Sequence, residues 1–124
     1  MNIPRNLKYT KTHEWVEMLV GKAKVGITDF AQQEISDIVH IELPEVGKIV
    51  KKEQPVAVVE SVKSAFDIYA PLSGKIIEIN DAILDSPEIV NQSTYEKGFL
   101  FIIEIADAKE METLLSSDDY QKLI

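Results

Sequence analysis

Residues 58–71 read VVESVKSAFDIYAP, and they contain the clearest structural signal of the chain. Two β-rich apolar runs, residues 56–60 and 65–69, flank a short polar segment, which is the pattern of a β-hairpin. Lys63 falls at the predicted tip, where the two strands would fix its position and leave its amine exposed. The sequence therefore predicts a hairpin around residues 56–70 that presents one lysine to the solvent.

Two interpretations of Lys63 stay open on its position alone. An exposed lysine amine is mostly a solvated cation, but an enzyme that docks on a rigid hairpin can acylate it. The resulting amide would form the inner part of a long, flexible arm. In the other interpretation, Lys63 is one of twelve lysines and lies in a turn because turns are polar.

More short strands are predicted on both sides of the hairpin, because apolar runs and alternating residues are separated by turn residues. They are expected at residues 14–20, 22–28, 37–43, 75–79 and 99–105. In the third of these, the alternation predicts that Val39, Ile41 and Leu43 share one face. Seven or so short strands are typical of a sandwich or barrel, so the predicted fold class is mostly β.

Helical signals are fewer and shorter. Asp29 followed by Gln32 resembles a capping pair and predicts a brief helix through Ile35. The run Ser86-Pro87-Glu88 predicts a second helix start, with Ser86 as the cap, a proline at the first helical position and an early acid.

The C-terminal residues 107–124 are predicted to form a helical segment. Asp107, with Glu110 three residues later, resembles a capping box. A last short helix is expected after Ser117, with Tyr120 and Leu123 buried.

Length and composition narrow the class of protein. The chain has 124 residues, no cysteine, 13 basic and 21 acidic side chains, and a formal net charge of -8. This length predicts a single domain over residues 1–124. Without a thiol there is no disulfide, no cysteine-ligated metal and no cysteine nucleophile. The acidic balance disfavours nucleic acid and membrane surfaces as partners and favours basic faces of other proteins.

Targeting signals are not visible in the sequence. Residues 1–15 contain neither the apolar run of an export signal nor the Arg- and Ser-rich pattern of a transit peptide. Apolar runs such as residues 99–103 are far shorter than the roughly 20 residues of a membrane helix. We therefore expect a location in the bacterial cytoplasm, or in the mitochondrial matrix for a chain whose transit peptide has been removed.

Motifs of enzymes are missing. The five glycines form neither a GxGxxG fingerprint nor a Walker loop, and no GxSxG elbow is present. A small hydrolase using His13 or His40 remains an alternative that only the availability of imidazole supports. His13 and Glu14 would point to opposite faces of a strand, so no metal site is expected.

Four blocks of the sequence resemble the H protein of the glycine cleavage system. They are YTKTHEWV (9–16), VGITDFAQ (25–32), ELPEVG (42–47) and ESVK (60–63), and the resemblance continues to YQKL (120–123). Lipoyl domains of the 2-oxo acid dehydrogenases typically carry Asp-Lys-Ala, and biotin carriers usually flank their lysine with methionine. The block Glu-Ser-Val-Lys therefore favours the H-protein family.

The resemblance implies a barrel-sandwich hybrid fold with short helices, in which Lys63 carries lipoic acid through an amide. It implies a carrier protein and not an enzyme. The arm would take an aminomethyl group from a pyridoxal-phosphate glycine decarboxylase to a tetrahydrofolate-dependent aminomethyltransferase, and dihydrolipoamide dehydrogenase would reoxidise it. A monomer is expected, since one hairpin must meet several enzymes. A lipoate storage or donor module of the same fold is the alternative function.

The resemblance also implies roles for two sets of residues. The enzymes that attach lipoate are expected to read the residues before the lysine, Glu60, Ser61 and Val62. A cleft that shields the loaded arm is expected to include Thr12, Glu14 and Asp67. A carboxylate there would stabilise the protonated amine. The alternative for the two acids is an exposed strand position or a turn partner.

Four positions depart from the family pattern. Ser36 and Glu53 stand where glycine is common, Phe66 replaces a small residue after the lysine, and Phe99 replaces a tryptophan. Glu53 is expected to strain its turn, because a residue other than glycine is disfavoured at positive φ. Phe66 is expected to cover the exit of the arm or to contact a partner.

Overall fold

Short strands make up most of the regular structure, and the computed structural model describes residues 1–124 in full. The strands are β1 (Lys8–Tyr9), β2 (Glu14–Leu19), β3 (Lys22–Ile27), β4 (Ile38–Glu42), β5 (Ile49–Val50), β6 (Pro55–Ser61), β7 (Ala65–Tyr69), β8 (Gly74–Ile79) and β9 (Phe101–Ile105). The longer strands follow the predicted ranges. β1 and β5 have two residues each, which is too short for a periodic signal.

The helical elements are brief. They are α1 (Asp29–Ile35), α2 (Ala82–Asp85), α3 (Glu88–Gln92), the 3-10 helix η1 (Ala108–Thr113) and α4 (Ser117–Gln121). None of them combines the length and the apolar character that crossing a membrane requires.

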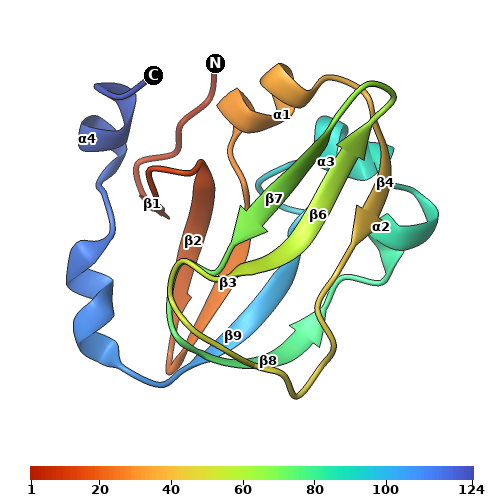
Figure 1. Cartoon of the computed structure of the whole chain (residues 1–124). Coiled ribbons are helices and arrows are strands. Elements are labelled where there is room, and N and C mark those ends of the chain that lie inside the picture. Colours follow the sequence, from red (N-terminus) through yellow and green to blue (C-terminus); the bar gives the residue numbers. More distant parts are fainter.

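Two antiparallel sheets lie face to face and enclose the main apolar core (Figure 1). The larger sheet has the strand order β1-β2-β3-β9-β8-β5, and the smaller sheet has the order β4-β6-β7. The core cluster contains 17 buried residues from both sheets and from α1, α2 and α3. The mostly-β prediction is confirmed, with two open sheets instead of one closed barrel.

The predicted hairpin is the β6–β7 pair. Its register runs from Pro55 opposite Tyr69 to Glu60 opposite Ala65. β6 also pairs with β4, so the hairpin is part of the smaller sheet. Val59 and Ile68 are buried in the core. Burial of these side chains makes the hairpin a firm support for its tip.

One predicted strand face is wrong. Val39 is 51% exposed, whereas Ile38 is buried. The cause is an irregularity in the β4–β6 register between Ile38 and His40, which changes the side-chain alternation at this point. Ile41 is buried as predicted.

The caps of two helices also differ from the prediction. Thr28 is the N-cap of α1, because its backbone is extended and its hydroxyl accepts a hydrogen bond from the Ala31 N–H at 3.1 Å. Asp29 is already helical and accepts from the Gln32 side-chain amide instead, at 2.7 Å. The N-cap position of α3 is Pro87, without a side-chain hydrogen bond, so Ser86 does not cap this helix.

The capping box predicted at the C-terminal segment is half formed. Asp107 caps η1 by accepting from the Lys109 N–H at 3.0 Å. The Glu110 carboxylate does not return to the cap. It accepts from the backbone N–H and the hydroxyl of Ser73, at 2.7 and 2.9 Å, and so ties η1 to the turn before β8.

Tyr120 joins α4 to the N-terminal residues. Its ring stacks on Tyr9 with 4.8 Å between the ring centroids. Its hydroxyl lies 2.8 Å from Thr28 Oγ1 and 2.8 Å from His13 Nδ1. Leu123 is 54% exposed, so its predicted burial is wrong. α4 ends at Gln121, one residue after Tyr120, so Leu123 lies beyond the helix whose face packs Tyr120.

Candidate functional site

Lys63 is exposed at the tip of the β6–β7 hairpin. Ser61 and Ser64 close the turn around it. The Ser61 N–H donates to the Ser64 carbonyl at 2.9 Å, and the Ser64 N–H donates to the Ser61 hydroxyl oxygen at 3.2 Å. Lys63 takes part in neither of the two salt bridges of the chain. The turn is therefore held by its own hydrogen bonds, and the lysine amine is free to react.

The three residues before the lysine differ in exposure. Glu60 and Ser61 are half-buried, whereas Val62 is 82% exposed. Glu60 lies opposite Ala65 at the last paired position before the turn. A protein that reaches the amine of Lys63 therefore meets all three residues.

A pocket of about 520 Å³ lies at the base of the same hairpin. Its lining comes from the start of β2, the turn before β6, the end of β7 and the C-terminal segment. The lining residues are Thr10, Lys11, Thr12, Glu14, Lys52, Glu53, Tyr69, Ala70, Pro71, Thr113 and Leu115. Four separate parts of the chain thus build this pocket, which will be called the Glu14 pocket.

Glu14 is fully buried, with an exposed fraction of 0%. Its Oε1 accepts from the hydroxyls of Thr10 and Thr12, at 2.6 and 2.5 Å. Its Oε2 accepts only from the Tyr69 N–H, at 3.3 Å. A carboxylate oxygen has two lone pairs, so Oε2 retains capacity to accept a further donor. No basic side chain forms a salt bridge with this carboxylate.

Burial dominates the electrostatics of Glu14. Removal of the carboxylate from water raises its pKa to about 7, although the hydrogen bonds from Thr10, Thr12 and Tyr69 lower it. A positive charge beside the carboxylate would favour the ionised form and lower the pKa again. The pocket lining carries two lysines, Lys11 and Lys52, as well as two acids, so the pocket as a whole is not acidic. Within it, the buried Glu14 carboxylate has no salt-bridge partner, and a small ammonium group would complement it.

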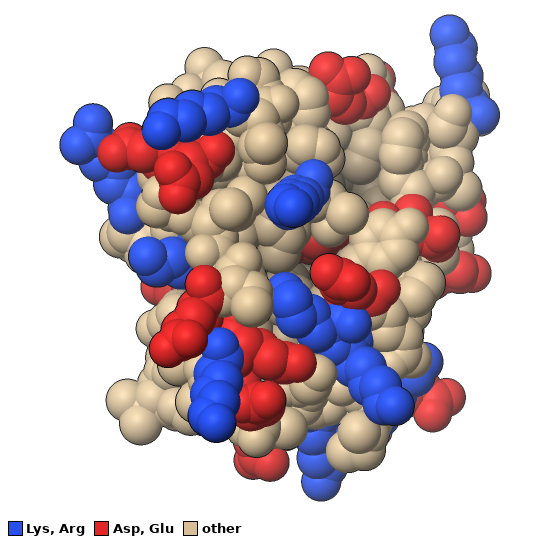
Figure 2. Space-filling view, turned by 60° about the vertical axis from the view of Figure 1, so that its left-hand side comes forward, with Lys and Arg blue, Asp and Glu red and all other residues tan.

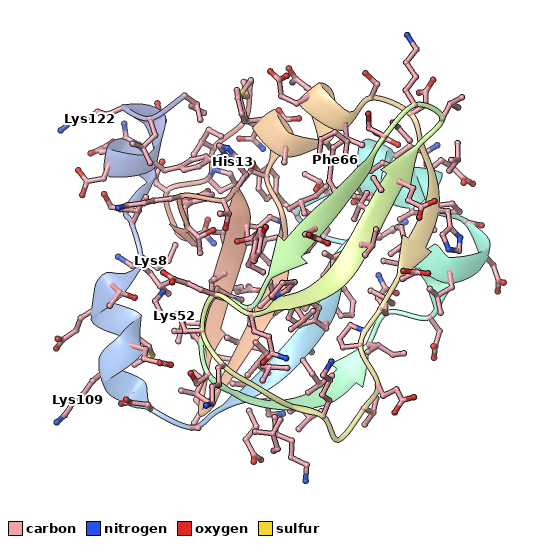
Figure 3. The ribbon with its side chains drawn as sticks, viewed as in Figure 1. Lys8, His13, Lys52, Phe66, Lys109 and Lys122 are labelled. Atoms are coloured by element: carbon pink, nitrogen blue, oxygen red, sulfur yellow. The ribbon has the colours of Figure 1, made fainter.

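Lys52 and Glu53 form one wall of the Glu14 pocket. The Lys52 Nζ donates to the Pro71 carbonyl at 3.2 Å, and Figure 3 shows this lysine at the base of the hairpin. Glu53 has a φ of 72°, so the expected strain of a non-glycine residue at this turn is present. Ser36, the other position where the family commonly has glycine, has a φ of 68°.

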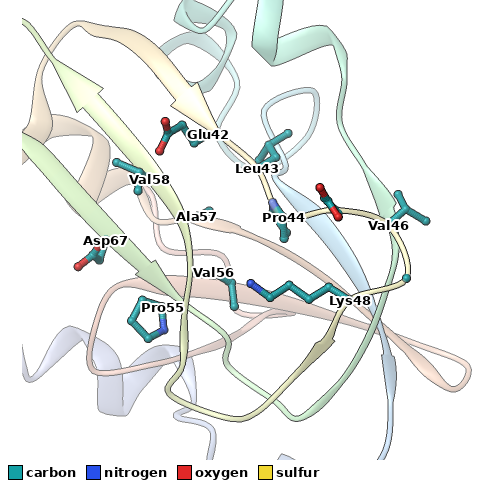
Figure 4. Close-up of a pocket in the computed structure, with 12 residues that line it drawn as sticks. Glu42, Leu43, Pro44, Val46, Lys48, Pro55, Val56, Ala57, Val58 and Asp67 are labelled. Atoms are coloured by element: carbon teal, nitrogen blue, oxygen red, sulfur yellow. The ribbon is translucent and has the colours of Figure 1, made fainter.

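Asp67 does not line the Glu14 pocket. It is exposed on β7 and lines a wider depression of about 1130 Å³ together with Glu42, Pro55 and Val58. Figure 4 shows these side chains around β6 and the segment after β4. The structure therefore brings together two of the three expected cleft residues, Thr12 and Glu14, and places Asp67 apart from them.

The two histidines have different surroundings. His13 is half-buried, packs against the Phe30 ring at a tilt of 40° with 4.8 Å between the ring centroids, and shares a hydrogen bond with Tyr120. Burial lowers its pKa, against the raising effect of Glu34. His40 is exposed, and its Nε2 lies 3.9 Å from Glu42. Neither imidazole forms a hydrogen bond with a serine, so nothing in the structure supports the hydrolase alternative.

Sequence reasoning missed Thr10 and the backbone of Tyr69. Thr10 holds Glu14 twice, because its hydroxyl donates to the carboxylate and accepts from the Glu14 N–H at 3.1 Å. The alternation of Thr10, Thr12 and Glu14 is a local signal that could have suggested shared contacts. The contact with Tyr69 joins residues 55 positions apart, and no local pattern predicts it.

The fold and the site define a class of protein. A free lysine stands on a closed turn between two core-anchored strands, and a buried acid lies at the other end of the same hairpin. This arrangement is that of a carrier, in which a lysine holds a prosthetic arm and the protein supplies the support.

Comparison with known proteins agrees with this class and identifies the family. The family model described as Glycine cleavage H-protein matches residues 7–124. A glycine cleavage system H protein of Endomicrobium trichonymphae is 70% identical over 124 residues, which is 100% of both chains. That of Bacillus subtilis (strain 168) is 46% identical over 123 residues and covers 99% of this chain and 97% of its own.

A solved structure is also similar. The crystal structure of a glycine cleavage system H protein from Mycobacterium marinum has a TM-score of 0.87 and 32% sequence identity, and it covers 97% of each chain. The chain belongs to the glycine cleavage H-protein family. It has the barrel-sandwich hybrid fold of lipoyl carriers, and it is the lipoyl carrier component of the glycine cleavage system and not a catalyst.

Proposed function

We propose that Lys63 carries lipoic acid through an amide bond on its Nζ. The observation that supports this proposal most directly is the free amine of Lys63 on a turn closed by Ser61 and Ser64. The half-buried Glu60 and the exposed Val62 flank that turn and fit a role in recognition by the enzymes that attach lipoate. When bound, the lipoyl group supplies a sulfur atom that accepts the aminomethyl group. It also supplies the dithiol–disulfide couple that is oxidised and reduced.

The role of the polypeptide is to hold and present the arm. We infer that the chain works as one lipoyl-carrier domain and a monomer, because a single hairpin tip has to enter several active sites. Its partners in this proposal are glycine decarboxylase, the aminomethyltransferase, dihydrolipoamide dehydrogenase and the lipoate-attaching enzymes. The bacterial sources of the similar H proteins favour the cytoplasm as the place of action.

The Glu14 pocket is proposed to receive the protonated amine of the loaded arm. The buried carboxylate has an under-used oxygen, Oε2, and no basic partner. The Thr10 and Thr12 hydroxyls hold Oε1 and so fix the direction of the carboxylate. An ammonium group would complete this site with a charge-assisted hydrogen bond. Asp67 could act on the arm only from outside this pocket.

Mass spectrometry and reconstitution test the proposal. Intact-mass and peptide analysis of protein from lipoate-making cells should find the lipoyl adduct on Lys63. The purified protein with glycine decarboxylase should then support exchange between glycine and bicarbonate. An adduct on another lysine, or none, would refute the attachment site. An adduct without exchange would instead indicate a storage or donor module.

A further inference from the structure

A second pocket lies beside Lys63 and is separate from the Glu14 pocket. It has a volume of about 330 Å³. One wall is the hairpin tip with Ser61, Val62, Lys63, Ser64 and Phe66, and the other is the turn from α1 to β4 with Glu34, Ile35, Ser36 and Asp37. In Figure 1 this turn passes next to the hairpin tip. The surroundings of Lys63 therefore include a segment about thirty positions earlier in the chain.

The pocket has apolar side chains close to the lysine. Val62 is 82% exposed and Phe66 is 37% exposed. Phe66 lies opposite Val59, which is buried in the core, but Phe66 itself stays partly exposed. Figure 3 shows it on the side of β7 toward α1. Exposed aromatic and aliphatic groups around a polar functional residue are typical of a protein-binding surface.

Two acids at the other wall have no salt-bridge partner, although Glu34 is close enough to His13 to raise its pKa. Glu34 lies in the last turn of α1, where the helix dipole disfavours a carboxylate, and no basic residue is present in that turn. Neither Glu34 nor Asp37 forms a salt bridge, and both are exposed. Their negative charge therefore contributes little to folding and is available to a partner.

The distribution of charge supports a specific role for these acids. On the face shown in Figure 2, acidic and basic side chains are interspersed, so the net charge of -8 does not form a single patch there. The apolar surface next to Lys63, bordered by two carboxylates without a salt bridge, is more sharply defined than this mixed distribution of charge. It complements a protein surface that presents a basic side chain with a long apolar stem.

We infer that the enzyme that lipoylates Lys63 docks on the hairpin tip together with the Glu34–Asp37 turn, and inserts an arginine or lysine side chain into the pocket between them. The inference rests on the proposed lipoylation of Lys63. Such an enzyme must bring its activated acyl carbonyl into bonding distance of Nζ itself. The C–N bond forms as Nζ loses a proton and the leaving group departs from the activated donor. The enzymes that act on the far end of the arm do not need to cover this surface.

Lipoylation kinetics test the docking surface. The unlipoylated chain is the substrate of a purified lipoate-attaching enzyme with its activated lipoyl donor, and intact mass follows the product. The Glu34→Gln/Asp37→Asn variant should raise KM about tenfold at low ionic strength with kcat unchanged, and high salt should remove most of the difference. Phe66→Ala should raise KM by a similar factor at both salt concentrations.

A matched control is available in Glu78→Gln/Asp85→Asn, which removes two exposed acids outside the pocket. Its KM should equal that of the wild type. Equal KM values for the Glu34→Gln/Asp37→Asn variant and this control would overturn the inference. If the wild-type chain itself receives no lipoyl group on Lys63, the proposed function fails instead, so the two failures are distinguishable.

Protection of an introduced cysteine from alkylation detects the docked enzyme directly, without a variant that binds it more weakly. The chain has no cysteine, so Asp37→Cys introduces a single reactive thiol. The bound lipoate-attaching enzyme should slow alkylation of this thiol at least about fivefold and leave that of Asp85→Cys unchanged. Equal alkylation rates with and without the enzyme for Asp37→Cys would contradict the docking surface.

Discussion

The two ends of the β6–β7 hairpin have opposite physical properties. At the tip, Lys63 is exposed, and the turn is closed by hydrogen bonds between residues three positions apart. At the base, Glu14 is completely buried and depends on hydroxyls from β1–β2 and a backbone N–H from β7. Both ends serve the same proposed arm.

In the proposed roles, one small protein separates attachment of the arm at Lys63 from protection of its cargo at Glu14. An attachment residue must be reached by other enzymes, so it needs exposure and few contacts. A residue that shields a cationic group needs removal from water, because a charge–charge interaction is strong only where the solvent is excluded. The chain uses the same pair of strands to meet both requirements.

The largest expected effect is at the tip. Lys63→Arg retains the positive charge but removes the primary amine, so it should abolish lipoylation and glycine–bicarbonate exchange completely. The free energy of unfolding should change by less than about 0.5 kcal/mol, because the side chain is exposed. Intact mass, the exchange assay and chemical denaturation measure the three outcomes. Lys97→Arg, at another exposed lysine, should retain full loading and exchange.

The base of the hairpin should respond to pH. Burial raises the pKa of Glu14 to about 7, so the folded state binds its proton more tightly than the unfolded state. The stabilisation from this proton is present below about pH 4.5 and is lost as pH rises toward 7. Glu14→Gln remains neutral, so its free energy of unfolding relative to the wild type should increase over this range by roughly 3 kcal/mol.

Denaturation of the unlipoylated protein at several pH values checks this result. The matched control is Glu96→Gln, which removes an exposed carboxylate that forms no salt bridge. Its stability profile should run parallel to that of the wild type. A parallel profile for Glu14→Gln as well would show that the Glu14 carboxylate is not protonated near neutral pH.

Glu14→Gln should also make the aminomethyl group on the loaded arm less stable against hydrolysis. Loss of the negative charge removes a charge-assisted hydrogen bond to the protonated amine, which is worth about 1.5–3 kcal/mol. Glu14→Gln should therefore release the one-carbon group about ten- to a hundredfold faster, measured as ammonia formed from the isolated loaded carrier. Asp67→Asn should have a much smaller effect, because Asp67 does not line the Glu14 pocket. Equal release rates for wild type and Glu14→Gln would remove the pocket from the mechanism.

A smaller effect is expected from Thr10. Thr10→Val removes a donor to the Glu14 carboxylate and leaves the Glu14 N–H without its acceptor, so it should lower the free energy of unfolding by about 1–2 kcal/mol. It should also raise the pKa of Glu14, which can be followed by NMR titration. Thr12→Val removes only a donor and should destabilise the protein less. Equal losses for the two variants would mean that the backbone contact contributes nothing.

The smallest expected change in the free energy of unfolding is at Glu53, in the wall of the Glu14 pocket. Glu53 has positive φ, so Glu53→Gly should relieve strain and raise the free energy of unfolding by about 0.5–1 kcal/mol. Lys51→Gly, two residues earlier and not at positive φ, should destabilise the protein instead. Thermal unfolding of both variants gives the comparison. A destabilised Glu53→Gly would show that the glutamate side chain contributes more than its backbone conformation costs.

The hairpin and its lysine could be predicted from the sequence because their signals are local. The apolar runs, the polar turn and the ESVK block all lie within residues 56–70. The face of β4 could not be predicted, because a register irregularity against β6 changes which side chains are buried. The exposure of Leu123 likewise depends on where α4 ends relative to the N-terminal residues.

The mostly-β class, the family and the exposed hairpin tip at Lys63 follow from residues close together in the sequence, and attachment of the arm to Lys63 stays a prediction. The burial of Glu14, its support by Thr10 and the position of Asp67 in another depression could be seen only in the folded chain. Exposure at a turn follows from neighbouring residues along the chain. The charge state of a buried acid follows from the solvent that distant segments exclude, and these segments meet only when the chain is folded.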